Sequence, residues 1–250
     1  MKRITLAILT LLAVSCADIM GTNKILVIGH RGAMGHETEN TLASVQKAMD
    51  LEVDMIEIDV FKIESGEIAV FHDERVERLT NGGGKIEEYN IVDLKQLILD
   101  GGYKIPMLQD VLKLINNKVA LNIELKGANT ADRVNFIVQH YIDDQGWAPD
   151  NFLISSFNWE ELREMRKLNP EIAIAVLTDE DPLDAIPTAR ELGASSINPD
   201  YKKLTPENVQ KIKEAGFNIY SWTVNEPGDI QLMKEMGVDG IITDFPERIR

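Results

Sequence analysis

The feature that most constrains the fold of this chain is a repeated alternation of strand-like and helical segments. Most of the strand-like runs are separated by segments with apolar residues three and four positions apart. The runs cover residues 25–29, 55–61, 119–125, 152–155, 172–177, 195–198, 218–224 and 240–243. Eight strands with helical crossovers in 250 residues predict an α/β fold, a (β/α)8 TIM barrel. The count of eight and the absence of a glycine-rich phosphate loop favour the barrel over a doubly wound open sheet.

The alternation is interrupted between the second strand and the helix that follows it. Residues 66–106 contain an extra strand, a glycine-rich turn at 82–84 and a short helical run around 91–99. We interpret this segment as an insertion within one barrel domain that spans residues 24–250. Loops at the C-terminal ends of barrel strands form the active face, so we expect the insertion to cover the barrel mouth.

Local signals also predict where the helices begin and end. Asn40 is placed to cap a helix that carries Leu42, Val45 and Met49 on one face. Asn158 or Ser156 is suited to begin the helix at 159–168. Only residues 245–250 follow the last strand, so the eighth helix is expected to be a stub or missing.

The first residues resemble an export signal. Lys2 and Arg3 precede a short apolar run at residues 4–14, which predicts a signal peptide over residues 1–15. Cys16, the only cysteine, follows Ala-Val-Ser, which is similar to the lipobox of bacterial lipoproteins. We therefore expect an exported, periplasmic or cell-surface lipoprotein, held at the membrane by a lipid on Cys16. Ordinary cleavage near Ser15 or Ala17 and a buried N-terminal helix are the alternatives.

The charge of the chain argues against a nucleic-acid partner. The formal net charge is −15, and loss of Lys2 and Arg3 with the signal would leave 24 basic residues against 41 acidic ones, a net charge of −17. Such a surface repels polyanions. A small anionic substrate is still compatible with it, provided that the site itself is locally positive.

Three carboxylates are predicted to converge at the C-terminal ends of neighbouring strands. Glu57 and Asp59 are two residues apart on the second strand and share one face of it. On the third strand Asn122, Glu124 and Lys126 also share a face. Glu57, Asp59 and Glu124 together predict an oxygen-ligand site for one divalent metal ion, Ca²⁺ or Mg²⁺.

Other polar residues at strand ends predict the remaining parts of a site. His30 and His72 lie on different elements and are suited to act as a general acid and a general base. Arg31 and Lys126 place positive charge beside the metal, as binding of a phosphate requires. Trp222 is expected at the barrel mouth, either as a wall of the substrate site or as packing.

Each of these motifs has a structural explanation when taken alone. An isolated Glu-x-Asp pair is more often a solvated strand edge, and Glu124 with Lys126 can be a structural ion pair. His36 and His140 are assigned to no site, since one lies in a loop and the other on an amphipathic helix. Several motifs are expected at the same rim of the barrel, and this coincidence favours a functional site.

These motifs, in this order and spacing, resemble the glycerophosphodiester phosphodiesterase (GDPD) family over residues 24–246. The matching segments are His30-Arg31-Gly32, Glu39-Asn40-Thr41, Glu57-Ile58-Asp59-Val60, His72-Asp73, Thr80-Asn81-Gly82, Ile105-Pro106-Met107-Leu108, Glu124-Leu125-Lys126 and Thr243-Asp244-Phe245-Pro246. Thr38 departs from the pattern, in which proline often stands. The resemblance implies a TIM barrel with an insertion at this place and a divalent metal, often Ca²⁺ or Mg²⁺.

The resemblance also implies residue roles and a reaction. Glu57, Asp59 and Glu124 would bind the metal, His30 and His72 would be the acid–base pair, and Arg31 and Lys126 would hold the phosphate. The reaction would be hydrolysis of glycerophosphodiesters to an alcohol and sn-glycerol 3-phosphate. Two alternatives stay open. A lysophospholipase D or sphingomyelinase D-like lipid phosphodiesterase is disfavoured by the insertion, and a non-catalytic protein that binds phosphorylated ligands is disfavoured by the intact histidines.

Overall fold

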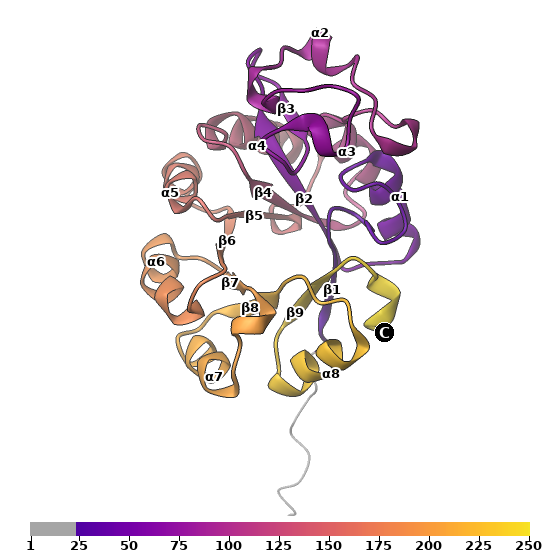
Figure 1. Ribbon diagram of the computed structural model, residues 1–250. Helices are drawn as coiled ribbons and strands as arrows, with labels where there is room; N and C mark the ends of the chain where they lie inside the picture. The colour runs from indigo at the N-terminus through magenta and orange to yellow at the C-terminus, as the bar shows by residue number, and fades with distance from the viewer. Residues whose placement is uncertain (1–23) are drawn as a thin grey trace, which may run out of the picture.

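The computed structural model describes residues 24–250, which form a closed barrel of parallel strands surrounded by helices (Figure 1). The strand order is β1-β9-β8-β7-β6-β5-β4-β2, and pairing of β1 with β2 closes the ring. The (β/α)8 barrel predicted from the sequence is therefore confirmed. The predicted signal peptide at residues 1–15 and the anchor at Cys16 lie outside the described residues. The barrel strands are β1 (Leu26–Gly29), β2 (Met55–Lys62), β4 (Ala120–Leu125), β5 (Phe152–Ser156), β6 (Ala173–Thr178), β7 (Ser196–Pro199), β8 (Asn218–Ser221) and β9 (Gly240–Thr243).

Helices between the strands form the outer layer and bury the apolar face of the barrel. They are α1 (Leu42–Asp50), α3 (Leu108–Ile115), α4 (Ala131–Gln145), α5 (Trp159–Leu168), α6 (Ala185–Leu192), α7 (Pro206–Glu214) and α8 (Pro227–Met236). The side chain of Asn158 accepts a hydrogen bond from the N–H of Glu160, so the predicted start of α5 is confirmed. After β9, the described chain continues only into a 3₁₀ turn, Pro246–Arg248, in place of an eighth full helix.

The predicted cap of α1 is wrong, and the difference bears on the site. Thr41, and not Asn40, is the N-cap residue, because its side chain accepts a hydrogen bond from the N–H of Ser44. Asn40 has a positive φ of 57° and turns its amide toward Asp59. Asparagine tolerates this left-handed conformation better than most residues.

The segment between β2 and α3 forms a small unit beside the barrel. Its strand β3 (Ile68–Val70) runs antiparallel to β2, and α2 (Ile91–Leu94) lies at the far edge of the molecule in Figure 1. The predicted helical run around 91–99 is thus only one turn of α-helix. A separate hydrophobic cluster, which includes Phe71, Ile86 and Leu94, holds the unit together. The chain that leaves β3 carries His72 to the barrel rim.

The register of β2 and β4 brings the acidic side chains together. Parallel pairing places Asp59 beside Glu124 and Glu57 beside Asn122. Since strand side chains alternate, Ile56, Ile58 and Val60 of β2 point outward into the helical layer. All of β2 between its two end residues is buried, so its carboxylates need partners within the barrel.

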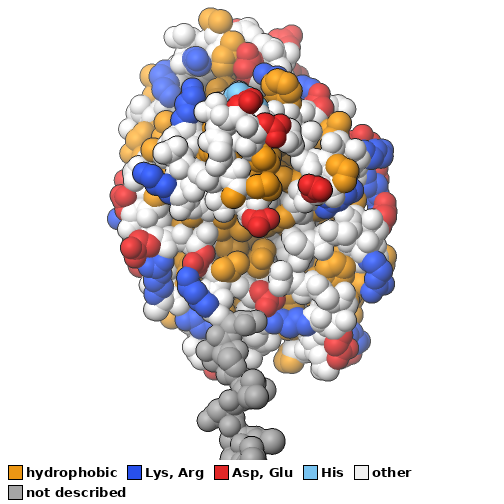
Figure 2. Space-filling model, turned by 180° about the vertical axis from the view of Figure 1, so that it is seen from behind, with side chains coloured by type: hydrophobic (Ala, Val, Ile, Leu, Met, Phe, Trp, Pro, Cys, Tyr) orange, Lys and Arg blue, Asp and Glu red, His pale blue; other side chains and the backbone are white. Residues whose placement is uncertain are grey.

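Within residues 24–250, no helix has both the length and the apolar character needed to cross a membrane. Figure 2 shows the side opposite to that of Figure 1, where acidic and basic side chains are interspersed around exposed hydrophobic ones.

Candidate active site

Three carboxylates meet at the C-terminal ends of β2 and β4. One oxygen from each of Glu57, Asp59 and Glu124 lies within 4.8 Å of the others. Oε1 of Glu57 is buried and has no hydrogen-bond partner among the described residues. Burial, with repulsion from Asp59, raises the pKa of Glu57 well above its usual range and raises the pKa of Glu124 to about 7. An acidic group buried in this way favours a bound cation.

Asn40 fixes the position of Asp59 through a two-way contact. Its Nδ2 donates to Oδ2 of Asp59 at 2.8 Å, and its Oδ1 accepts from the Asp59 N–H at 3.2 Å. Asp59 is only 1% exposed, so this contact holds its carboxylate in one orientation. The unusual backbone of Asn40 is therefore part of the site and not of the helix cap.

The turn after β1 places Arg31 against the acidic group. Arg31 has a φ of 49°, its N–H donates to Oε2 of Glu57 at 2.8 Å, and its guanidinium donates to Glu39 at 2.7 Å. Gly32 follows with a φ of 86°, and a Cβ there would lie 2.5 Å from Ser44. Burial lowers the pKa of Arg31, but Asp59, Glu39 and Glu57 outweigh it and the net shift is upward. Arg31 thus stays charged.

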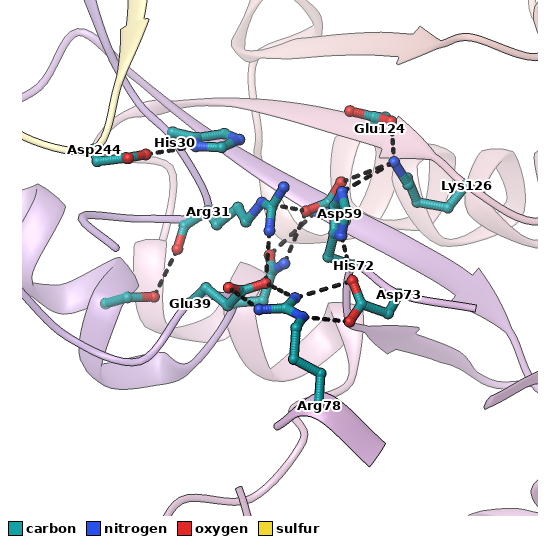
Figure 3. A network of polar contacts seen from close by, with 12 residues as sticks. His30, Arg31, Glu39, Asp59, His72, Asp73, Arg78, Glu124, Lys126 and Asp244 are labelled. Atoms are coloured by element: carbon teal, nitrogen blue, oxygen red, sulfur yellow. Dashed lines mark hydrogen bonds and ion pairs between the residues drawn. The ribbon is translucent and has the colours of Figure 1, made fainter. Parts of the chain in front are cut away.

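Lys126 supplies a second cation from the end of β4. Its Nζ donates to Oε1 of Glu124 at 2.9 Å and lies 3.8 Å from Oδ1 of Asp59. Burial lowers the pKa of Lys126, but these carboxylates outweigh it and raise the pKa. Figure 3 shows Arg31 and Lys126 approaching Asp59 from different directions. Arg31 and Lys126 thus bring two positive charges to the site, and these suit a phosphate once a cation offsets the carboxylates.

Each predicted acid–base histidine is held by a carboxylate at its Nδ1 (Figure 3). His30 contacts Asp244 at 2.7 Å, and His72 contacts Asp73 at 2.6 Å. An ionised carboxylate can only accept, so in the neutral imidazole Nδ1 carries the proton and Nε2 keeps a lone pair. Nε2 of His72 lies 3.3 Å from Nζ of Lys126. Burial lowers the pKa of His72, and the charges of Arg31 and Lys126 lower it further.

Most of these side chains line one cavity of about 100 Å³. Trp222 and Phe157 form an aromatic edge to it, with ring centroids 5.4 Å apart in an edge-to-face arrangement. Asp59 is not among the residues that line the cavity. A larger hollow of about 680 Å³ between α7 and α8 contains none of the predicted site residues. The cavity is lined by His30, Arg31, Glu57, His72, Asn122, Glu124, Lys126, Phe157, Leu177, Trp222, Thr223 and Ile242.

Several residues around the site had no predicted role. Asp244 and Asp73 belong to the quoted motifs; Asp73 directly follows His72, whereas Asp244 is 214 residues from His30 and its only signal was its place at the end of the last strand. Glu39 also belongs to a motif, but nothing in the sequence connects it to Arg78, with which it is paired. His36 contacts Glu247 and His140 contacts Asp144, and neither lines the cavity.

Comparison with known proteins identifies the family. The glycerophosphoryl diester phosphodiesterase family matches residues 30–248, nearly all of the described chain. The chain belongs to this family.

Relatives in the family cover the chain almost from end to end. A glycerophosphodiester phosphodiesterase from Caldanaerobacter subterraneus is 35% identical over 90% of this chain and 96% of its own. A phosphodiesterase from Oleispira antarctica, solved in complex with the product sn-glycerol-3-phosphate, is 28% identical, with a TM-score of 0.83 over 90% of this chain and 94% of its own. The glycerophosphodiester phosphodiesterase from Thermotoga maritima is 26% identical, with a TM-score of 0.74 over 90% of this chain and 96% of its own.

Proposed function

We propose that this family member hydrolyses glycerophosphodiesters to an alcohol and sn-glycerol 3-phosphate, with a divalent metal and two histidines. The observation that carries the proposal is the shared cavity. His30 and His72, each oriented by a carboxylate, line it together with Arg31, Lys126 and two acidic residues. The product named for the Oleispira antarctica relative supports the same substrate class.

The acidic residues fit a divalent metal ion. Glu57, Asp59 and Glu124 offer converging oxygens, and Oε1 of Glu57 has no other partner among the described residues. Carboxylate oxygens suit Ca²⁺ or Mg²⁺. Bound there, the ion would offset most of the negative charge of the triad and polarise an oxygen of the substrate phosphate.

The chain's own residues supply the rest of the chemistry. Arg31 and Lys126 bind and orient the phosphate through charge-assisted hydrogen bonds. One imidazole accepts the proton of the attacking hydroxyl at Nε2, and the other donates a proton from Nε2 to the leaving alkoxide. Asp244 and Asp73 keep the two rings in the Nδ1-protonated form that this requires. The attacking hydroxyl belongs either to water or to the glycerol of the substrate.

The size of the cavity predicts which diesters are used. About 100 Å³ suits a phosphoglycerol group and not an acyl chain beside it. We expect release of glycerol 3-phosphate from a panel of glycerophosphodiesters, with turnover of lysophospholipids and sphingomyelin much slower. Faster turnover of the lipids would favour the lipid phosphodiesterase. Binding of glycerol 3-phosphate with no product from any diester, with Ca²⁺, Mg²⁺ or Mn²⁺ supplied, would favour a binding protein.

Metal binding is expected to stabilise the fold as well as support turnover. A metal at a hundred times its Kd adds about 2.7 kcal/mol to the free energy of unfolding. For a chain of this size that raises Tm by roughly 5–10 °C. The measurement is Tm in the presence of chelator and again after Ca²⁺ or Mg²⁺ is added. The rate of glycerol 3-phosphate release is measured under both conditions. Full activity after dialysis against chelator, with no change in Tm on adding metal, would contradict a metal site.

A further inference from the structure

Arg78 connects two parts of the candidate site without lining the cavity. It ends the 3₁₀ turn Val76–Arg78 of the segment between β2 and α3. Its guanidinium makes four hydrogen bonds, two to each of two carboxylates. Nε and Nη2 donate to Asp73 at 2.5 and 2.9 Å, and Nη1 and Nη2 donate to Glu39 at 2.9 and 2.7 Å. Figure 3 shows Arg78 between these two acids, on the side away from Glu124 and Lys126.

Each of these acids in turn holds a residue that does line the cavity. Asp73 accepts from Nδ1 of His72 at 2.6 Å, and Glu39 accepts from Arg31 at 2.7 Å. One planar guanidinium therefore sets the position of an imidazole and, separately, of the phosphate-binding arginine. The fork geometry of arginine suits such paired contacts, whereas the single ammonium of lysine cannot reproduce them.

The burial of Glu39 makes Arg78 necessary for this arrangement. Glu39 is 6% exposed and its Oε2 accepts from Arg78. Burial raises the pKa of Glu39, but hydrogen bonds from Arg78, with the charge of Arg31, outweigh it and lower the pKa. The Arg78 hydrogen bonds also lower the pKa of Asp73 to about 2. A carboxylate left without Arg78 would turn toward water or toward the remaining cation, and its partner in the cavity would move with it.

We propose that Arg78 is a positioning residue that aligns His72 and Arg31 at the same time, and so couples the segment after β2 to the barrel rim. The proposal rests on the function proposed above, because it assigns His72 to proton transfer and Arg31 to phosphate binding. Arg78 itself touches neither the cavity nor the substrate. Its loss should therefore affect turnover through His72 and affinity through Arg31.

The test compares Arg78→Ala and Arg78→Lys with the matched control Arg75→Ala. Arg75 lies three residues earlier on the same segment, and its side chain is 58% exposed and pairs with Glu77. We expect either Arg78 variant to lower kcat by about 10–100-fold, the range seen when a group that orients the residues of a site is removed. KM for glycerophosphocholine should rise as well. Arg75→Ala should stay within twofold of wild type.

Three further measurements separate positioning from a general loss of fold. Added guanidinium should restore part of the kcat of Arg78→Ala and none of that of His72→Ala. In the His72→Ala background, Arg78→Ala should lower kcat by less than about threefold, since residues that act as a unit are not additive. Thermal unfolding of each variant shows whether it is folded at the assay temperature.

A spectroscopic measurement tests the positioning role of Arg78 without an activity assay. In wild type, the ¹H–¹⁵N spectrum of His72, assigned with His72→Gln, should show the Nδ1-protonated form, and Arg78→Ala should show a mixture of both forms. A folded Arg78→Ala with wild-type kcat, KM and His72 spectrum would overturn the inference. An inactive wild-type protein would instead overturn the proposed function, and the His72 spectrum would still decide whether Arg78 positions the ring.

Discussion

His30→Ala and His72→Ala are each expected to lower kcat for glycerophosphocholine by about 10²–10⁴-fold, the usual contribution of a positioned general acid or base. Each ring is fixed by a carboxylate at Nδ1, which leaves Nε2 for proton transfer. Both side chains are partly exposed, at 16% and 29%, so their truncation should leave the fold intact. The effect should therefore appear in kcat with little change in Tm.

His140→Ala is the matched control for these variants. His140 also pairs with a carboxylate, Asp144, but it lies on α4 and outside the cavity, and its side chain is 49% exposed. We expect its kcat to equal that of wild type. Wild-type turnover by folded, metal-loaded His72→Ala would show that the acid–base assignment is wrong for this residue.

The choice of leaving group separates the roles of the two histidines. An ester of glycerol 3-phosphate with 4-nitrophenol needs little protonation of its leaving oxygen, unlike the choline ester. The variant that lacks the general acid should therefore lose much less kcat on the nitrophenyl ester than on the choline ester. The variant that lacks the general base should lose a similar factor on both.

The barrel and the acidic group follow from regular periods in the sequence. A period of two on the second strand puts Glu57 and Asp59 on one face, and parallel pairing with the next strand adds Glu124. The same reasoning fixes Lys126, since it continues the face of Glu124. The three carboxylates lie on regular strands and Lys126 directly follows one, so spacing alone determines which side chains share a face.

The remaining parts of the site depend on loops, where no repeating sequence pattern predicts the path of the chain. Asn40 resembles a helix cap, but its backbone and amide are set by Asp59, which lies 19 residues away in the chain. The pairing of Glu39 with Arg78 spans 39 residues and depends on the folding of the segment after β2. The local sequence around Asn40 or Glu39 looks like that of an ordinary turn, because the residue that each of them contacts is distant in the chain.

Asp59→Asn is expected to remove both metal binding and turnover. Asparagine keeps the shape of aspartate but lacks its charge, and the triad would lose the carboxylate whose Oδ2 lies 3.3 Å from Nε of Arg31 and whose Oδ1 lies 3.8 Å from Nζ of Lys126. Loss of the charge stabilisation that a metal supplies is worth several kcal/mol. At 1.36 kcal/mol for each factor of ten, kcat should fall by about 10³-fold. The rise in Tm on adding Ca²⁺ or Mg²⁺ should disappear with it.

Asp132→Asn is the control for this substitution, because Asp132 is an exposed acid that pairs with Lys62 outside the cavity. Its kcat and its metal-dependent rise in Tm should match those of wild type. The same pair of measurements separates a metal site from a purely structural ion-pair network around Lys126. If Asp59→Asn lost stability in chelator but kept the full metal-dependent rise in Tm, the carboxylates would be structural partners of Arg31 and Lys126, and the metal would bind elsewhere.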